Sequence, residues 1–70
     1  MSMKLEMLIY NLKREYRELT DKLNNLDHAL DNLDISERQR DLLYRQEYHM
    51  RCYLEVLDMR TRDLESNNEA

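Results

Sequence analysis

The sequence contains no glycine and no proline, the residues that most often interrupt or end a helix. It has a single cysteine, Cys52, which excludes a disulfide within the chain. Its Cys and His residues show no metal-ligand spacing, and without glycine it has no glycine-rich phosphate loop. We therefore expect no metal, no cofactor and no catalytic constellation, and we predict a protein that is not an enzyme.

Long hydrophobic runs and an excess of positive charge are lacking as well. No stretch approaches the ~20 apolar residues of a membrane-spanning helix, and charges recur near the N-terminus before any apolar run reaches signal-peptide length. The net charge of −4 gives no general attraction to nucleic acid or to an anionic membrane. With one cysteine, which fits a reducing compartment, these features predict a cytoplasmic protein with no membrane partner and no sequence-specific nucleic-acid partner.

What the sequence does contain is a regular heptad pattern in its first half. Steps of four and three residues alternate without a gap, which keeps one stripe of a helix facing a partner. The pattern predicts a helix over about 3–33, with Ser2 as its N-cap. The positions of the stripe are Leu5, Ile9, Leu12, Tyr16, Leu19, Leu23, Leu26, Leu30 and Leu33.

A second helix is predicted to begin after a turn at 34–36. Ser36 and Gln39 have the S-x-x-Q form of a capping box, so the helix should run over about 37–65, followed by a flexible polar tail at 67–70. Gln46 and Arg60 interrupt its core stripe. Either they lie at the edge of the stripe, with Arg60 reaching to solvent, or they specify register or form a polar site shared between subunits. The predicted stripe is Leu43, Gln46, Met50, Tyr53, Leu57, Arg60 and Leu64.

Two helices of about thirty residues joined by a short turn predict an antiparallel hairpin. Each helix has its acidic excess at its own C-terminal end, and antiparallel packing places that end beside the more basic end of the other helix. We thus predict an all-α, coiled-coil-like two-helix hairpin over residues 1–66. Because so short a chain buries little surface, we expect the hairpin to assemble into a homo-oligomeric helical bundle. One unbroken helix is the alternative.

The second helix also has an unusual outer side, with Tyr44, Tyr48, Cys52 and Met59 pointing away from the predicted core. Exposed apolar groups in contiguous patches usually mark contact sites. After Lys22 every cation is an Arg, whose planar fork suits carboxylates and phosphates and stacks on rings. These Arg residues either pair with acidic neighbours on a solvated helix, or form a site in which Tyr stacks a base and Arg holds a phosphate. The candidate partner- or ligand-binding residues are Tyr44, Arg45, Gln46, Tyr48, Arg51, Met59, Arg60 and Arg62.

A pattern of residues at the turn and along the second helix carries a resemblance. It consists of Ser36, Leu42, Leu43, Gln46, Met50, Tyr53, Leu57 and Arg60. The pattern resembles small helical-hairpin proteins of tailed bacteriophages and prophages, including those of crAss-like phages. The resemblance implies a phage origin, an accessory role and action in the cytoplasm of the bacterial host.

Two functions are predicted. The first is a non-enzymatic phage accessory protein that acts by binding, in counter-defence: it inhibits a host immune protein, or sequesters a nucleotide immune signal at Arg and Tyr surfaces of an oligomer. The second is a purely structural assembly protein without a ligand, in which the outer Tyr and Met residues form a second oligomer interface. The expected partners are therefore further copies of the chain and a host protein or a small nucleotide.

Overall fold

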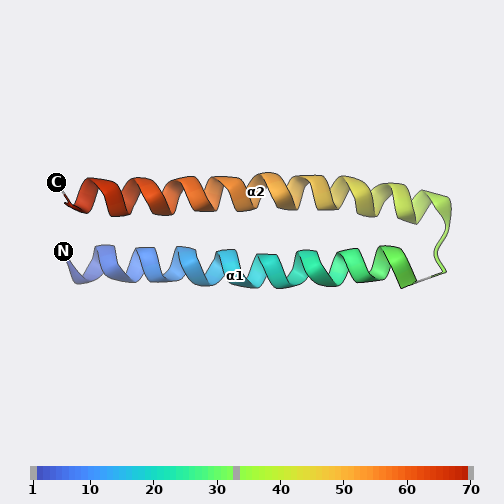
Figure 1. Cartoon of the computed structure of the whole chain (residues 1–70), viewed down its shortest axis with the longest axis horizontal. Coiled ribbons are helices and arrows are strands. Elements are labelled where there is room, and N and C mark those ends of the chain that lie inside the picture. The colour runs from blue at the N-terminus through green and yellow to red at the C-terminus, as the bar shows by residue number, and fades with distance from the viewer. Residues whose placement is uncertain (1, 33, 70) are drawn as a thin grey trace.

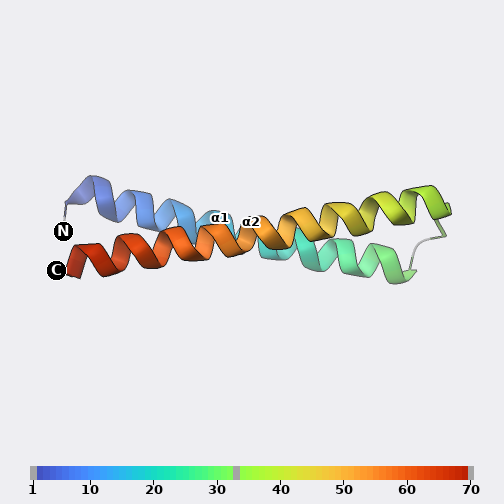
Figure 2. The ribbon, with the colours of Figure 1, turned by 90° about the horizontal axis from the view of Figure 1, so that it is seen from above.

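A computed structural model of the chain describes residues 2–32 and 34–69, without the side chains of 32 and 67–69. Helix α1 (Met3–Asn32) and helix α2 (Glu37–Glu69) lie side by side and antiparallel, so that both termini lie at one end of a rod of 51 × 15 × 14 Å (Figure 1). Seen from above, the helices cross near their middles at a shallow angle (Figure 2). The predicted all-helical hairpin is confirmed.

Serine hydroxyls cap both helices. The backbone N–H of Leu5 donates to Ser2 Oγ at 3.1 Å, and the N–H of Gln39 donates to Ser36 Oγ at the same distance. Each hydroxyl satisfies one of the N–H groups that a first turn leaves without an intrahelical acceptor. The caps therefore fix the residues at which α1 and α2 begin.

A side chain of α2 also stabilises the end of α1. The guanidinium of Arg40 donates to the backbone carbonyl of Leu30, in the last turn of α1. Among the residues that the structure describes, this last turn has no basic side chain of its own. Arg40 therefore supplies, across the turn, the positive charge that favours a helix C-terminus.

The heptad stripe of α1 forms half of the core. Most of its leucines and Ile9 are buried against α2, Leu5 and Leu19 are half-buried, and Tyr16 is 41% exposed. Leu33 lies outside the described residues. The buried apolar residues of both helices are Ile9, Leu12, Leu23, Leu26, Leu30 and Leu57.

The stripe of α2 that faces α1 differs from the predicted stripe at three positions. Leu43, Met50, Leu57 and Leu64 face α1 as expected and are buried or half-buried. Between them the structure places positions 47, 54 and 61 against α1, and leaves 46, 53 and 60 exposed. Gln46 and Arg60 therefore lie outside the core of the hairpin, as expected if they lie at the edge of the stripe, and Tyr53 lies beside the core rather than in it.

The cost of burying polar groups explains why position 61, and not position 60, faces α1. Thr61 is only 8% exposed, and its hydroxyl donates to the Leu57 carbonyl of the same helix at 2.8 Å. Burying the Arg60 guanidinium or the Gln46 amide without such a partner would be far less favourable. Positions 54 and 61 therefore face α1, and they bring Glu47 with them, whose side chain is 20% exposed and pairs with Arg51 of the same helix at 3.3 Å.

Helix α2 also continues to Glu69, so the tail expected to be flexible over 67–70 is helical up to that residue. The final residues are polar, but none is Gly or Pro. With no residue that ends a helix, the ladder of backbone hydrogen bonds continues almost to the end of the chain.

Candidate binding site

The two edges along which the helices meet differ in chemistry. On one, which we name the ion-pair edge, Lys13 Nζ lies 3.0 Å from Glu65 Oε1 and Arg51 Nη2 lies 3.7 Å from Asp27 Oδ2. On the other, the tyrosine edge, the Tyr53 hydroxyl donates to the Glu15 carboxylate. Such pairs between flanking positions are typical of an antiparallel coiled coil, and they form in the register that the turn and the packed core set.

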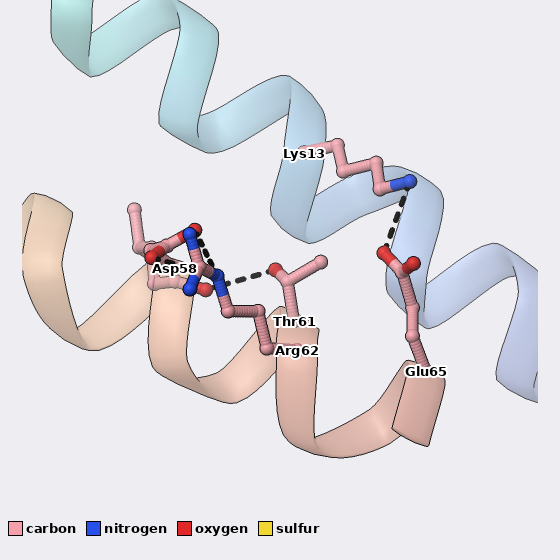
Figure 3. Close-up of polar contacts among 6 residues, drawn as sticks. Lys13, Asp58, Thr61, Arg62 and Glu65 are labelled. Carbon is pink, nitrogen blue, oxygen red and sulfur yellow. Dashed lines mark hydrogen bonds and ion pairs between the residues drawn. The ribbon is translucent and has the colours of Figure 1, made fainter. Parts of the chain in front are cut away.

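A hollow of about 280 Å³ opens on the ion-pair edge, between the first half of α1 and the last third of α2. We name it the terminal groove. Figure 3 shows how Lys13 reaches across from α1 while most of the other side chains rise from α2. The residues that line it are Lys13, Tyr16, Asp58, Thr61, Arg62 and Glu65.

The hollow exists because a small side chain faces a ring that does not fill the space. Thr61 occupies a core-facing position, where its side chain fills less space than the neighbouring core-facing residues Leu57 and Leu64. Tyr16 is the one aromatic residue of the α1 stripe, and it is 41% exposed. The Tyr16 ring is therefore accessible to a molecule in the groove.

Charges of both signs surround this ring. Arg62 Nε lies 3.1 Å from Asp58 Oδ2 and 3.3 Å from Asp58 Oδ1, and Lys13 pairs with Glu65 (Figure 3). All four side chains are at least 44% exposed, so water screens both pairs and each contributes little to stability. The cations and carboxylates of the groove can therefore exchange their present partners for groups of a ligand at small cost.

The outer residues predicted to bind a partner are exposed on α2. Tyr44, Tyr48 and Met59 are 52–66% exposed, and the Tyr48 ring meets His49 edge-on with centroids 5.5 Å apart. Gln46 donates to the sulfur of Met50, and Arg60 lies exposed. None of these side chains lines the terminal groove.

Several predicted arginines pair with carboxylates one turn away on their own helix. Arg45 lies 3.4 Å from Asp41, and Arg51 lies 3.3 Å from Glu47. This is the arrangement expected of a solvated helix face. Of the predicted binding residues, Arg62 alone lines the terminal groove.

The sequence interpretation missed the rest of the groove. Tyr16 had been assigned to the core, and Lys13, Asp58, Thr61 and Glu65 had not been singled out. Flanking positions of opposite charge on the two helices, Lys13 and Glu65, were the available signal. They become neighbours only in one antiparallel register, which the sequence does not state directly.

Among residues 2–32 and 34–69, no helix is long and apolar enough to cross a membrane. The same part of the chain holds no group of three or more His, Cys, Asp or Glu side chains placed to bind a metal ion.

Fold and groove together define a small helical hairpin with a charged, aromatic-lined hollow between its helices. The chain belongs to the Sequestin family, whose model matches residues 8–63. The family name is compatible with a protein that binds and sequesters another molecule. The match spans both helices and includes every groove residue except Glu65. Comparison with curated proteins and with solved structures finds no match.

Proposed function

We propose that this protein acts by binding rather than by catalysis, and that it sequesters a nucleotide immune signal in the cytoplasm of a bacterial host, as a counter-defence protein of a phage. One observation carries the proposal: the terminal groove holds an accessible ring, two cations and two carboxylates within a single hollow. The Sequestin family name, which denotes sequestering, is compatible with it.

These groups correspond to the three parts of a nucleotide. The exposed face of Tyr16 can stack a base, as aromatic side chains do in proteins that bind single-stranded nucleic acid. Lys13 and Arg62 can donate to phosphate oxygens, since a phosphate accepts charge-assisted hydrogen bonds from both. Asp58 and Glu65 can accept hydrogen bonds from ribose hydroxyls. A free phosphate or a simple apolar ligand would use only some of these groups.

The size of the hollow limits how much of a ligand it can hold. Its volume of about 280 Å³ lies just below the ~300–1,000 Å³ range of small-molecule pockets. The groove therefore fits one nucleoside phosphate unit. A cyclic dinucleotide or trinucleotide would place one unit in the groove and the remainder against the surface beside it, or in a groove of another copy.

Thermal shift and calorimetry with cyclic dinucleotides, cyclic trinucleotides and nucleoside monophosphates test the proposal. A ligand that binds only the folded hairpin raises its melting temperature by mass action. We expect a rise with at least one of these compounds, and recovery of that compound unchanged after denaturation of the complex. Absence of any shift at concentrations far above micromolar would remove the nucleotide, and a chemically altered compound would remove the non-enzymatic role.

Neighbouring residues on α1 provide a matched pair of variants for this test. Lys13→Gln removes a groove cation, whereas Arg14→Gln removes a cation that lies outside the terminal groove and pairs with Glu18 at 3.8 Å. We expect Lys13→Gln to weaken nucleotide binding about tenfold, as for the loss of one charge-assisted hydrogen bond, and Arg14→Gln to leave it unchanged. Equal effects of the two variants would show that overall charge, and not the groove, attracts the ligand.

A second function in the same class uses the outer surface of α2. Exposed Tyr44, Tyr48 and Met59 are residue types enriched at protein interfaces, so a host immune protein could bind there. Tyr48→Ala together with Arg51→Ala should abolish capture of such a protein from host lysate and spare the nucleotide-induced thermal shift. If the double variant instead dissolves the oligomer, the outer surface serves assembly, and the purely structural role gains support.

A further inference from the structure

Apolar side chains remain exposed along the tyrosine edge of the hairpin. Leu8, Leu42, Tyr53 and Val56 are each 38–46% exposed. Leu8 lies two turns before Glu15, the acceptor of the Tyr53 hydrogen bond, and so projects on the same side of α1. Leu42 and Val56 lie about three turns before and one turn after Tyr53, so they share its side of α2. We name this surface, which includes Lys22 and Ala29 on α1, the tyrosine face.

The two edges of the hairpin are therefore suited to different uses. The ion-pair edge carries charged groups that join the helices and faces solvent, and the terminal groove opens there. The tyrosine face combines partly exposed Leu, Val and Tyr side chains with charged groups of both signs, and exposed apolar groups of this kind are typical of contact surfaces.

The area available matches the need of a dimer. A face of 51 × 15 Å corresponds to roughly 800 Å² per partner, the amount that each subunit buries in a standard-size interface. A single hairpin has a thin core: among the described side chains, Leu57 is the one whose exposure falls to 0%. Covering the tyrosine face would add a second apolar layer to it.

We propose that a second copy of this chain occupies the tyrosine face and forms a four-helix bundle with a twofold axis that crosses the hairpins at their middles. Each α1 then lies antiparallel to α1 of the other copy, and each α2 to the other α2. In such an isologous interface every contact occurs twice, once in each direction. This inference specifies the interface of the homo-oligomer in the proposed function and does not depend on the nucleotide.

Charge complementarity selects this arrangement. The middle of α1 falls close to the point halfway between Glu15 and Lys22, so the axis brings Glu15 of each copy to Lys22 of the other. It brings Leu8, by the same symmetry, to the small Ala29. If the axis ran along the hairpin instead, each α1 would lie on α2 of the other copy and the Glu15–Lys22 pairing would be lost. The antiparallel placement of like helices is therefore the one that pairs Glu15 with Lys22 and Leu8 with Ala29.

The centre of the face fits this symmetry as well. Tyr53 is the middle residue of α2, so it lies beside its own counterpart. A hollow of about 310 Å³ opens there, floored by Leu19 and Tyr53, into which side chains of the second copy can pack. Its rim carries two acidic and two basic groups, so each copy offers both signs to the other. The residues that line it are Arg14, Glu15, Glu18, Leu19, Lys22 and Tyr53.

Two neighbouring exposed residues of α1 give the first test. Leu8→Lys places a charge in the proposed interface, whereas Met7→Lys places one on the outer side of the helix, where Met7 is 59% exposed. In light scattering we expect the wild type and Met7→Lys to have twice the chain mass of 8.7 kDa, and Leu8→Lys and Val56→Lys to have the mass of one chain. Circular dichroism confirms that each variant remains helical. A monomeric wild type, or equal dissociation by Met7→Lys and Leu8→Lys, overturns the proposal.

A charge exchange gives a second test that does not depend on apolar contacts. Glu15→Lys and Lys22→Glu each create two like-charge contacts per dimer, and each should raise the dissociation constant of the dimer about tenfold. The double variant Glu15→Lys with Lys22→Glu restores opposite charges and should return to within about twofold of wild type. If the double variant is as weak as the two single variants combined, these residues do not meet and the proposed axis is wrong.

Failure of this inference can be told from failure of the proposed function. A wild type that is monomeric but still melts higher with a cyclic nucleotide overturns the dimer and leaves sequestering intact. A dimer that dissociates with Leu8→Lys but shows no thermal shift with any nucleotide supports the interface and removes the nucleotide.

Discussion

At the scale of single residues, the most informative position is Thr61. A buried hydroxyl is tolerated there because it donates to the Leu57 carbonyl, which lies one turn earlier in the same helix. Nothing on α1 has to supply a partner. A leucine at this position would extend the heptad stripe, but it would also fill the terminal groove. At Thr61 the core is therefore less well packed than it would be with leucine, and a hollow remains, as is common at functional sites.

Substituting Thr61 should therefore separate stability from binding. Thr61→Leu adds apolar contact in the core, and we expect a gain of about 1 kcal/mol, or a rise of roughly 4–8 °C in the melting temperature. The same change should abolish the nucleotide-induced thermal shift. Thr20→Leu is the matched control, since the Thr20 hydroxyl makes the same bond to the Tyr16 carbonyl at 2.8 Å but lies outside the groove. Retention of nucleotide binding by Thr61→Leu would contradict the assignment of the groove.

At the scale of the helices, regularity decided how much could be predicted. Every second position of the α1 stripe is Leu, so both the helix and its buried side could be predicted from the sequence. In α2, two alternative core stripes share Leu43, Met50, Leu57 and Leu64. One adds positions 46, 53 and 60 and the other adds 47, 54 and 61, and periodicity alone does not distinguish them. The choice depends on the relative cost of burying Arg60 or Thr61, which requires knowledge of local hydrogen bonds.

The terminal groove was beyond prediction for a related reason. Its two walls come from different helices, and Lys13 meets Glu65 only when the turn and the packed leucines set one register. The ends of the helices were easier, because Ser2 and Ser36 carry local capping signals. What depends on neighbours in sequence could be read from this chain, and what depends on register between helices could not.

The contact between Arg40 and α1 gives a prediction at this scale. Arg40→Ala removes the hydrogen bond to the Leu30 carbonyl and the charge beside the C-terminus of α1, and we expect a loss of about 1–2 kcal/mol in the free energy of unfolding by urea. Arg38→Ala is the control: Arg38 is exposed near the start of α2, and its loss should change stability by less than about 0.5 kcal/mol. Equal losses in the two variants would mean that general charge, rather than this bond, stabilises the turn.

At the scale of the whole molecule, the hairpin has two long sides with separate roles. The tyrosine face is suited to a second copy, and the terminal groove opens on the opposite, ion-pair edge. A bundle formed through the tyrosine face would therefore leave two grooves open to solvent, one in each copy. Assembly would then stabilise the protein without closing the grooves, which is compatible with the proposed sequestering role.

This separation predicts the stoichiometry of capture. If the groove of each hairpin is a complete site, isothermal titration with a cyclic nucleotide that binds should give one ligand per chain. The monomeric variant Leu8→Lys should bind with an affinity within about threefold of wild type, because it leaves every groove residue in place. One ligand per dimer, together with loss of binding in Leu8→Lys, would instead place the site between copies. In that case the nucleotide would have to span two hairpins, and the outer Tyr and Arg residues of α2 would become the groups to test, since a ligand that bridges two copies needs contacts beyond a hollow of about 280 Å³.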